Sequence, residues 1–132
     1  MRVNRNAKPD VIERISLRVL FNEIRYEASR SRLSLDDRLN EAAQKHAEWM
    51  YRAGVLSHEG APRYFWQRIR AEGYDYILAG ENIAMGYAST EGVVNAWRRS
   101  AGHYRNIVDP AMRHCGFGRR GLYWCAIVAA PR

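Results

Sequence analysis

The sequence has 132 residues, of which 47% are hydrophobic, and this is enough for one domain with a buried core. No stretch approaches the roughly 18 consecutive apolar residues of a membrane span, and the basic N-terminus lacks the apolar run of a signal peptide. The net charge of +7 comes almost entirely from arginine. It indicates a solvated basic surface or affinity for anionic surfaces, and without a reader module we expect no nucleic-acid partner.

The first predicted helix opens at Lys8-Pro9-Asp10, since proline is tolerated in a first turn. Apolar residues recur at helical spacing along one of its faces, and a second apolar stripe follows another side. We therefore expect this helix to contact neighbours on both sides. The first stripe is Leu17, Leu20, Phe21, Ile24 and Ala28, and the second is Ile12, Ile15, Val19 and Tyr26.

A second helix is predicted to start at Asp36, a capping residue, and to end at Gly54, a helix-terminating glycine. His46 lies on its apolar face, which is typical of a core histidine, so we leave it out of the site. His58 follows in a loop beside the helix end. Residues 61–71 then form a predicted third helix that is rich in aromatic residues: Tyr64, Phe65 and Trp66.

Tyr74 and Tyr76 lie in a loop, where we expect them to be exposed and either to line a ligand groove or to pack at the domain edge. A strand is predicted over residues 77–87. A fourth helix is predicted to begin at Ser89, in a capping pattern, and to stop near Ser100–Gly102. His103 is expected directly after that helix.

Two closing strands are predicted over residues 114–118 and 122–130, joined as a hairpin. They carry Cys115 and Cys125, for which a cross-strand disulfide and a pair of buried thiols are both open. Helices that precede a strand, another helix and a terminal hairpin predict an α+β domain, with a small sheet covered by helices.

His58, Glu81 and His103 each stand beside small or turn-forming residues, which suggests a polar cleft. Such a cleft could do chemistry, bind a metal ion or only support the fold. In the last case Glu81 would bond backbone amides, and His103 would cap the C-terminus of the preceding helix as a cation.

Short motifs occur along the chain in a fixed order, and an ordered set is far more specific than any one of them. They are Asn22-x-x-Arg25, a helix with Leu39, His46 and Met50, Ser57-His58, Gly80-Glu81-Asn82-Ile83, Trp97-x-x-Ser100-x-Gly102-His103-Tyr104-x-Asn106-Ile107, Cys115-Gly116-Phe117-Gly118 and Tyr123-Trp124. The set resembles the bacterial form of the CAP superfamily, or SCP domain, which includes cysteine-rich secretory, antigen 5 and plant pathogenesis-related proteins.

The resemblance covers roughly residues 11–130. It implies a three-layer α-β-α sandwich over residues 11–132, with a small antiparallel sheet between helices and an N-terminal tail at residues 1–10. It also implies a cleft in which His58, Glu81 and His103 converge. Because many members are exported, it implies an extracellular or periplasmic location.

This sequence departs from the eukaryotic members at the position three residues after Trp97. Those members place there a second glutamate, which completes a tetrad of two histidines and two glutamates. Here the position holds Ser100, and Glu91, nearly two turns earlier, is a doubtful substitute. An activity that needs the full tetrad is therefore not expected.

The first hypothesis is a divalent metal such as Zn²⁺ held by His58 and His103, with Glu81 as a ligand or as a group that orients a histidine or a bound water. The second is a metal-assisted hydrolase of amides or esters, with His58, Glu81 and His103 as the catalytic residues. Ser57 beside His58 does not by itself make a nucleophile.

The third hypothesis is a module that binds lipid, sterol or cell-wall material through the basic surface and an aromatic cluster. The fourth is a purely structural or interaction domain. We expect binding rather than catalysis, and a monomer. The aromatic cluster is Tyr64, Phe65, Trp66, Tyr74 and Tyr76.

Overall fold

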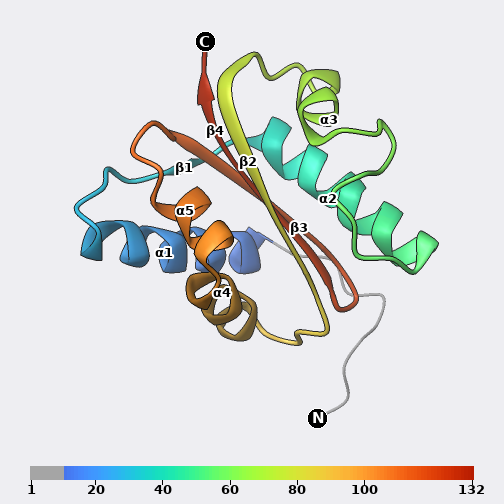
Figure 1. Cartoon of the computed structure of the whole chain (residues 1–132), viewed down its shortest axis with the longest axis horizontal. Coiled ribbons are helices and arrows are strands. Elements are labelled where there is room, and N and C mark those ends of the chain that lie inside the picture. Colours follow the sequence, from blue (N-terminus) through green and yellow to red (C-terminus); the bar gives the residue numbers. More distant parts are fainter. Residues whose placement is uncertain (1–10) are drawn as a thin grey trace.

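The structure is a computed structural model that describes residues 11–132 (Figure 1). The predicted helix start at Lys8-Pro9-Asp10 and the predicted tail at residues 1–10 lie outside these residues. Over the described part, the elements in chain order are α1 (Val11–Glu27), β1 (Ser34–Leu35), α2 (Asp37–Ala53), α3 (Phe65–Ala71), β2 (Tyr76–Met85), α4 (Thr90–Arg99), α5 (Ala101–Val108), β3 (His114–Arg120) and β4 (Tyr123–Pro131).

The strands form one sheet in the order β1-β3-β4-β2. The pairs β3–β4 and β4–β2 are antiparallel, as expected, and β3 and β4 form the predicted hairpin, which turns at Gly121 with φ 59°. The short strand β1 pairs in parallel with the start of β3, so the sheet is mixed. Sequence reasoning missed β1 because a strand of two residues is too short to show an alternating pattern.

Helices cover both faces of the sheet, which makes the expected three-layer α-β-α sandwich (Figure 1). One core lies between the sheet and helices α1, α4 and α5, and the other lies between the sheet and helices α2 and α3. Alternate residues of β4 enter different cores: Trp124 faces α1, whereas Ile127 faces α2. Among the described residues, no helix combines the length and apolar character needed to cross a membrane.

The two cysteines belong to different cores. Cys115 pairs in register with Val128 and packs on the α1 side, while Gly118 pairs with Cys125, which packs on the α2 side. Thiols that project from opposite faces of a sheet cannot form a disulfide. Both cysteines are free and buried, so the second of the two open alternatives is correct.

Helix α2 lies unusually close to β3 because β3 has glycines where the two elements meet. A Cβ added at Gly116 would lie 2.2 Å from the carbonyl carbon of Leu39. The close approach lets the Oδ1 atom of Asn40 accept the backbone N–H of Phe117 at 2.9 Å. Gln44 bonds the same edge of β3 one turn later. These side chains form hydrogen bonds with backbone groups of β3 that lie beyond the end of β1 and so, among the described residues, have no strand partner on that edge.

The predicted helix boundaries near caps agree with the structure. The side chain of Asp36 accepts the backbone N–H of Arg38, and Gly54 ends α2 with a left-handed φ of 69°. Ser89 caps α4 by accepting the backbone N–H of Gly92. These contacts are local in sequence, which is why the pattern of residues reveals them.

Three expectations about helices are wrong. The third helix begins at Phe65 rather than at residue 61. His103 is not in a loop after α4: the chain turns at Ser100 and His103 lies in the first turn of the new helix α5. Within the described residues, the second stripe of α1 meets solvent instead of a neighbour, and Val19, for example, is 44% exposed.

Candidate functional site

Glu81 is the centre of the candidate site. It lies on β2 opposite Ile127, and its side chain is only 1% exposed. Its Oε1 atom is 2.9 Å from Nδ1 of His58, and its Oε2 atom is 2.6 Å from Nη2 of Arg68. Burial opposes ionisation, but the hydrogen bond with His58 and the positive charge of Arg68 outweigh it and lower the pKa of Glu81. Glu81 is therefore a buried carboxylate with partners on both oxygens.

Arg68 is the residue of the site that sequence reasoning missed. It comes from α3, and its side chain is 3% exposed. Besides Glu81, it binds the loop before α3, because its Nη1 atom donates to the carbonyl oxygens of His58 and Pro62, both at 3.1 Å. No local pattern marks this arginine, since its partners are a distant strand and a loop. It fixes the loop that carries His58 to the carboxylate of Glu81.

His58 is half exposed although its partner is buried. Its ring is 56% exposed, against 1% for the side chain of Glu81. A carboxylate can only accept, so Nδ1 of His58 carries the proton and donates to Glu81. In the neutral ring, Nε2 then keeps its lone pair. This is the arrangement by which a carboxylate orients a metal-binding or proton-carrying histidine.

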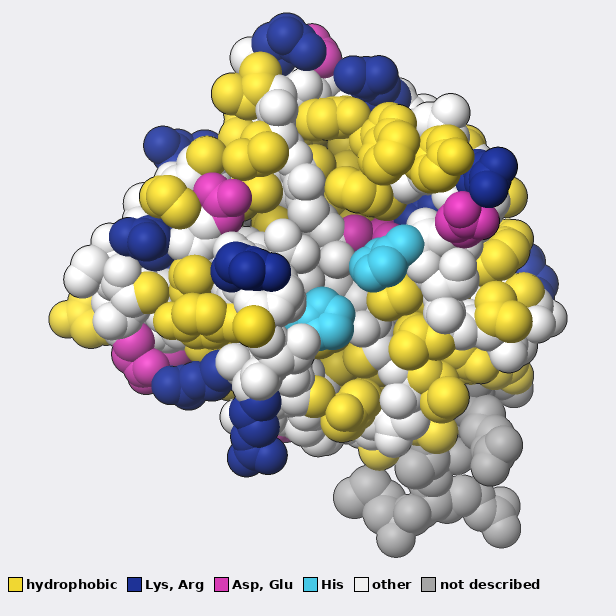
Figure 2. All heavy atoms as spheres, in the orientation of Figure 1, with side chains coloured by type: hydrophobic (Ala, Val, Ile, Leu, Met, Phe, Trp, Pro, Cys, Tyr) yellow, Lys and Arg dark blue, Asp and Glu magenta, His cyan; other side chains and the backbone are white. Residues whose placement is uncertain are grey.

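His103 reaches the same face of the molecule from α5. Burial lowers the pKa of His103, and repulsion from His58 in its protonated form lowers it further, which favours the neutral ring of His103. The helix is tied to β2 by amide side chains: Asn82 donates to the carbonyl of His103 at 3.1 Å, and Asn106 donates to Asn82 at 2.9 Å. Figure 2 shows histidine side chains gathered on this face, with acidic atoms beside them and hydrophobic side chains around.

Two hollows adjoin these histidines. His58 and Glu81 line a cavity of about 340 Å³, and His103 and Ser100 line another of about 300 Å³. Part of the wall of the first cavity is the aromatic ledge, which we define as Tyr64, Phe65 and Trp66. In this ledge the rings of Tyr64 and Trp66 are stacked, with centroids 4.7 Å apart.

The two other tyrosines of the expected cluster lie elsewhere. Tyr74 is 1% exposed, and its hydroxyl bonds Nδ1 of His114 at 2.7 Å, so the expectation that it is exposed is wrong. Tyr76 begins β2 and lies under the guanidinium of Arg70. Tyr74 packs into the α2 core, which a loop composition does not reveal.

The structure does not replace the missing second glutamate. Ser100 stands in the His103 hollow and brings no carboxylate there. Glu91 lines a different hollow, between α1 and α4, together with Arg98. Within residues 11–132, no group of at least three His, Cys, Asp or Glu side chains is placed to hold a metal ion. A metal ion in the cleft would therefore have His58 and His103 as its protein ligands and water for the rest.

The two candidate nucleophiles beside the site, Ser57 and Cys125, are not available for catalysis. The hydroxyl of Ser57 accepts the backbone N–H of Glu59 at 3.0 Å. Cys125 lies 3.6 Å from Oε2 of Glu81, and burial raises the pKa of this thiol well above its usual value. Neither group resembles an activated nucleophile.

The contacts that the structural hypothesis assumed for Glu81 and His103 are not those of the structure. Glu81 bonds side chains rather than backbone amides. His103 begins α5 instead of ending α4, so it is no C-terminal cap. His46, by contrast, is a core histidine as expected: it is 1% exposed, and its Nε2 atom donates to the carbonyl of Ser57 at 2.7 Å. It thereby supports the loop that presents His58.

Comparison with known proteins agrees with this architecture. The family model described as CAP, the cysteine-rich secretory protein family, matches residues 19–121. The uncharacterized protein YkwD of Bacillus subtilis is 34% identical over 109 residues, which are 80% of this chain and 42% of that protein. The uncharacterized membrane protein YlbC of the same organism is 31% identical over 106 residues. These residues are 80% of this chain and 31% of that protein. The chain thus spans less than half the length of these relatives.

Solved structures show the same fold at low identity. An extracellular SCP-domain protein from Bacillus anthracis superposes with a TM-score of 0.86 and 22% identity, over 89% of this chain and 40% of that one. An outer surface protein from Borrelia burgdorferi superposes with a TM-score of 0.82 and 22% identity, over 96% and 99%.

Proposed function

This chain belongs to the CAP family of cysteine-rich secretory proteins, and we propose that it is an extracellular binding module. In this proposal His58 and His103 hold a divalent metal ion, and a lipid, cell-wall or other small ligand occupies the cavity beside them. The extracellular location is supported by the structural neighbours, which are an extracellular protein and an outer surface protein.

The observation that carries the proposal is the pairing of a buried carboxylate with an exposed imidazole. Arg68 already neutralises Glu81, so the fold does not need His58 to compensate that charge. Holding this ring in one orientation buries little of it, since 56% of the His58 side chain stays exposed. A ring that is held in one orientation and faces solvent supports a binding role for His58 rather than a role in core packing.

The donor set fits a weakly held zinc ion better than a closed structural one. Both histidines can offer neutral nitrogen, which Zn²⁺ prefers. Glu81 has both oxygens engaged, so its role is to orient His58 rather than to bind the ion. Bound zinc would supply a Lewis-acidic centre at the two histidines, to which an anionic or carbonyl group of a ligand could bind.

The aromatic ledge supports the second half of the proposal. Trp66 is 39% and Tyr64 37% exposed, so flat apolar surface stands open beside the polar pair of His58 and Glu81. Such a combination suits an amphipathic ligand, whose apolar part packs on the rings. The net charge of +7 favours anionic lipid or wall material as its source.

Binding is preferred to hydrolysis because of the state of Glu81. A general base needs a pKa near the working pH and access to water. The pKa of Glu81 is lowered instead, and its side chain is 1% exposed.

Calorimetric titration with Zn²⁺ tests the metal site. We expect His58→Ala and His103→Ala each to lose at least about tenfold in affinity. His114→Ala is the matched control, because His114 bonds Tyr74 outside the cleft. Equal zinc affinity in all four proteins would refute the proposed metal site.

A further inference from the structure

The outer face of α1 carries an apolar stripe with spacings of three, four and seven residues. Its members are Ile12, Ile15, Val19 and Tyr26, which are 74%, 41%, 44% and 84% exposed. Leu17 and Ile24, on the opposite side of the helix, are buried. Residues spaced in this way form one seam along a helix, as in coiled coils. Helix α1 thus has one face in the core and a second apolar face in solvent.

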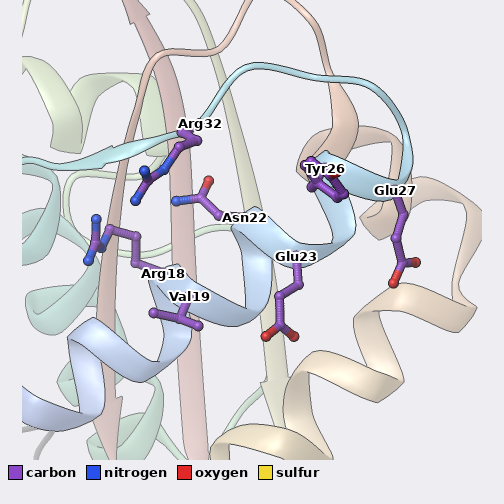
Figure 3. Close-up of a pocket in the computed structure, with 7 residues that line it drawn as sticks. All are labelled: Arg18, Val19, Asn22, Glu23, Tyr26, Glu27 and Arg32. Atoms are coloured by element: carbon purple, nitrogen blue, oxygen red, sulfur yellow. The ribbon is translucent and has the colours of Figure 1, made fainter.

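Over its C-terminal half, at Val19 and Tyr26, the stripe runs between two oppositely charged flanks (Figure 3). A hollow of about 370 Å³ has Val19 and Tyr26 among its lining residues. Arg18 and Arg32 stand on one side of it, and Glu23 and Glu27 on the other. Isolated exposed apolar residues are common, but a seam with charged borders of opposite sign is the pattern of a helix-pairing surface.

We propose that two copies of this chain associate through the outer faces of α1, with the two helices running in the same direction. A two-fold axis parallel to the helices turns the basic flank of one copy toward the acidic flank of the other. Arg18 of each copy then faces Glu23 of the other, five residues further along, which is the usual ion-pair spacing of parallel helices. An antiparallel pair would set like flanks against each other.

Existing contacts on the flanks show which charged residues can form ion pairs across the interface. Glu27 already pairs with Arg98 at 2.7 Å, so Glu23 is the acidic partner that the pairing uses. The amide of Asn22 exchanges hydrogen bonds with the backbone of Leu33 and holds the loop with Arg32 beside the seam. The cleft residues lie outside α1, so the association goes beyond the proposed function and does not depend on it.

Single cysteines along the seam test both the contact and its direction. In a parallel pair every seam residue meets its own copy, so Ile12→Cys and Tyr26→Cys should each form a covalent dimer under mild oxidation. Native Cys115 and Cys125 are buried and do not compete. Ile77→Cys, at an exposed position of β2, is the control that should stay monomeric. Crosslinking only between an Ile12→Cys chain and a Tyr26→Cys chain would overturn the parallel arrangement.

Sedimentation equilibrium tests the association without crosslinks. Val19→Arg should weaken dimerisation at least about tenfold, and the control Ile77→Arg should leave it unchanged. Arg18→Glu and Glu23→Arg should each weaken it, and the double variant should recover because the pair is restored with reversed polarity. A wild-type chain that stays monomeric up to about 1 mM, or a dimer that ignores Val19→Arg, would overturn the proposal.

Discussion

Nδ1 of His58 lies 2.9 Å from Oε1 of Glu81, and the two side chains differ greatly in exposure, at 56% and 1%. The buried carboxylate is held in turn by Arg68, whose guanidinium also binds the carbonyl of His58. Loop, helix and strand therefore meet at one carboxylate. This arrangement leads to predictions about stability, pH dependence and binding.

Glu81→Gln should lower the free energy of unfolding by about 3–5 kcal/mol, because it leaves Arg68 as a buried charge without its carboxylate partner. Urea unfolding measures the change. Arg98→Ala, which breaks the exposed pair with Glu27, should change stability by no more than about 1 kcal/mol. If the two variants lowered the free energy of unfolding by equally small amounts, the buried pair of Glu81 and Arg68 would not be important for the stability of the fold.

Stability should fall as the pH drops below about 6.5. Burial lowers the pKa of His46 and of His103. Below pH 6.5 the unfolded chain therefore binds more protons at these residues than the native chain does. The stability is complete above the unfolded pKa and is lost as the pH falls toward the folded pKa, by at most about 1.4 kcal/mol per pH unit for each group.

Urea unfolding from pH 7.5 to 5.0 measures this slope. His46→Gln should make it shallower, even though the variant begins less stable. The protonation of Glu81, whose pKa is also lowered, acts only at more acidic pH. A slope that is the same with and without His46 would contradict the account of this buried imidazole.

Gly116→Ala should be strongly destabilising, by about 1–3 kcal/mol or more, because the added Cβ would meet the backbone of Leu39 and Asn40. Gly102→Ala is the matched control. Its Cβ would meet only Arg105, at 3.9 Å, and alanine favours the helix, so the variant should be unchanged or about 1 kcal/mol more stable. Thermal unfolding of the two variants side by side distinguishes close packing from a general effect of losing glycine.

Trp66→Ala should weaken cosedimentation with anionic vesicles or cell-wall fragments by about tenfold, since it removes an open ring of the ledge. Leu78→Ala, at another exposed apolar position, should have no effect. Raising the salt concentration should weaken whatever part of the binding depends on charge. Binding that Trp66→Ala leaves intact would remove the ledge from the proposal.

The sequence predicts well what depends on neighbouring residues and poorly what depends on distant ones. The caps at Asp36 and Gly54 follow from local chemistry, and the ordered motifs give the three-layer sandwich. Arg25 illustrates the limit: the sequence marks it only as part of a short motif, whereas in the structure it is fully buried and donates to the carbonyls of Ile107 and Asp109. Arg68 escaped notice for the same reason.

A zinc-soaked crystal, measured at the zinc absorption edge, tests the central claim most directly. The proposal predicts one anomalous peak about 2.0–2.1 Å from a ring nitrogen of both His58 and His103. Glu81 should still contact Arg68 and Nδ1 of His58. A peak that involves only one of these histidines, a peak elsewhere, or none at all would contradict the proposed metal site.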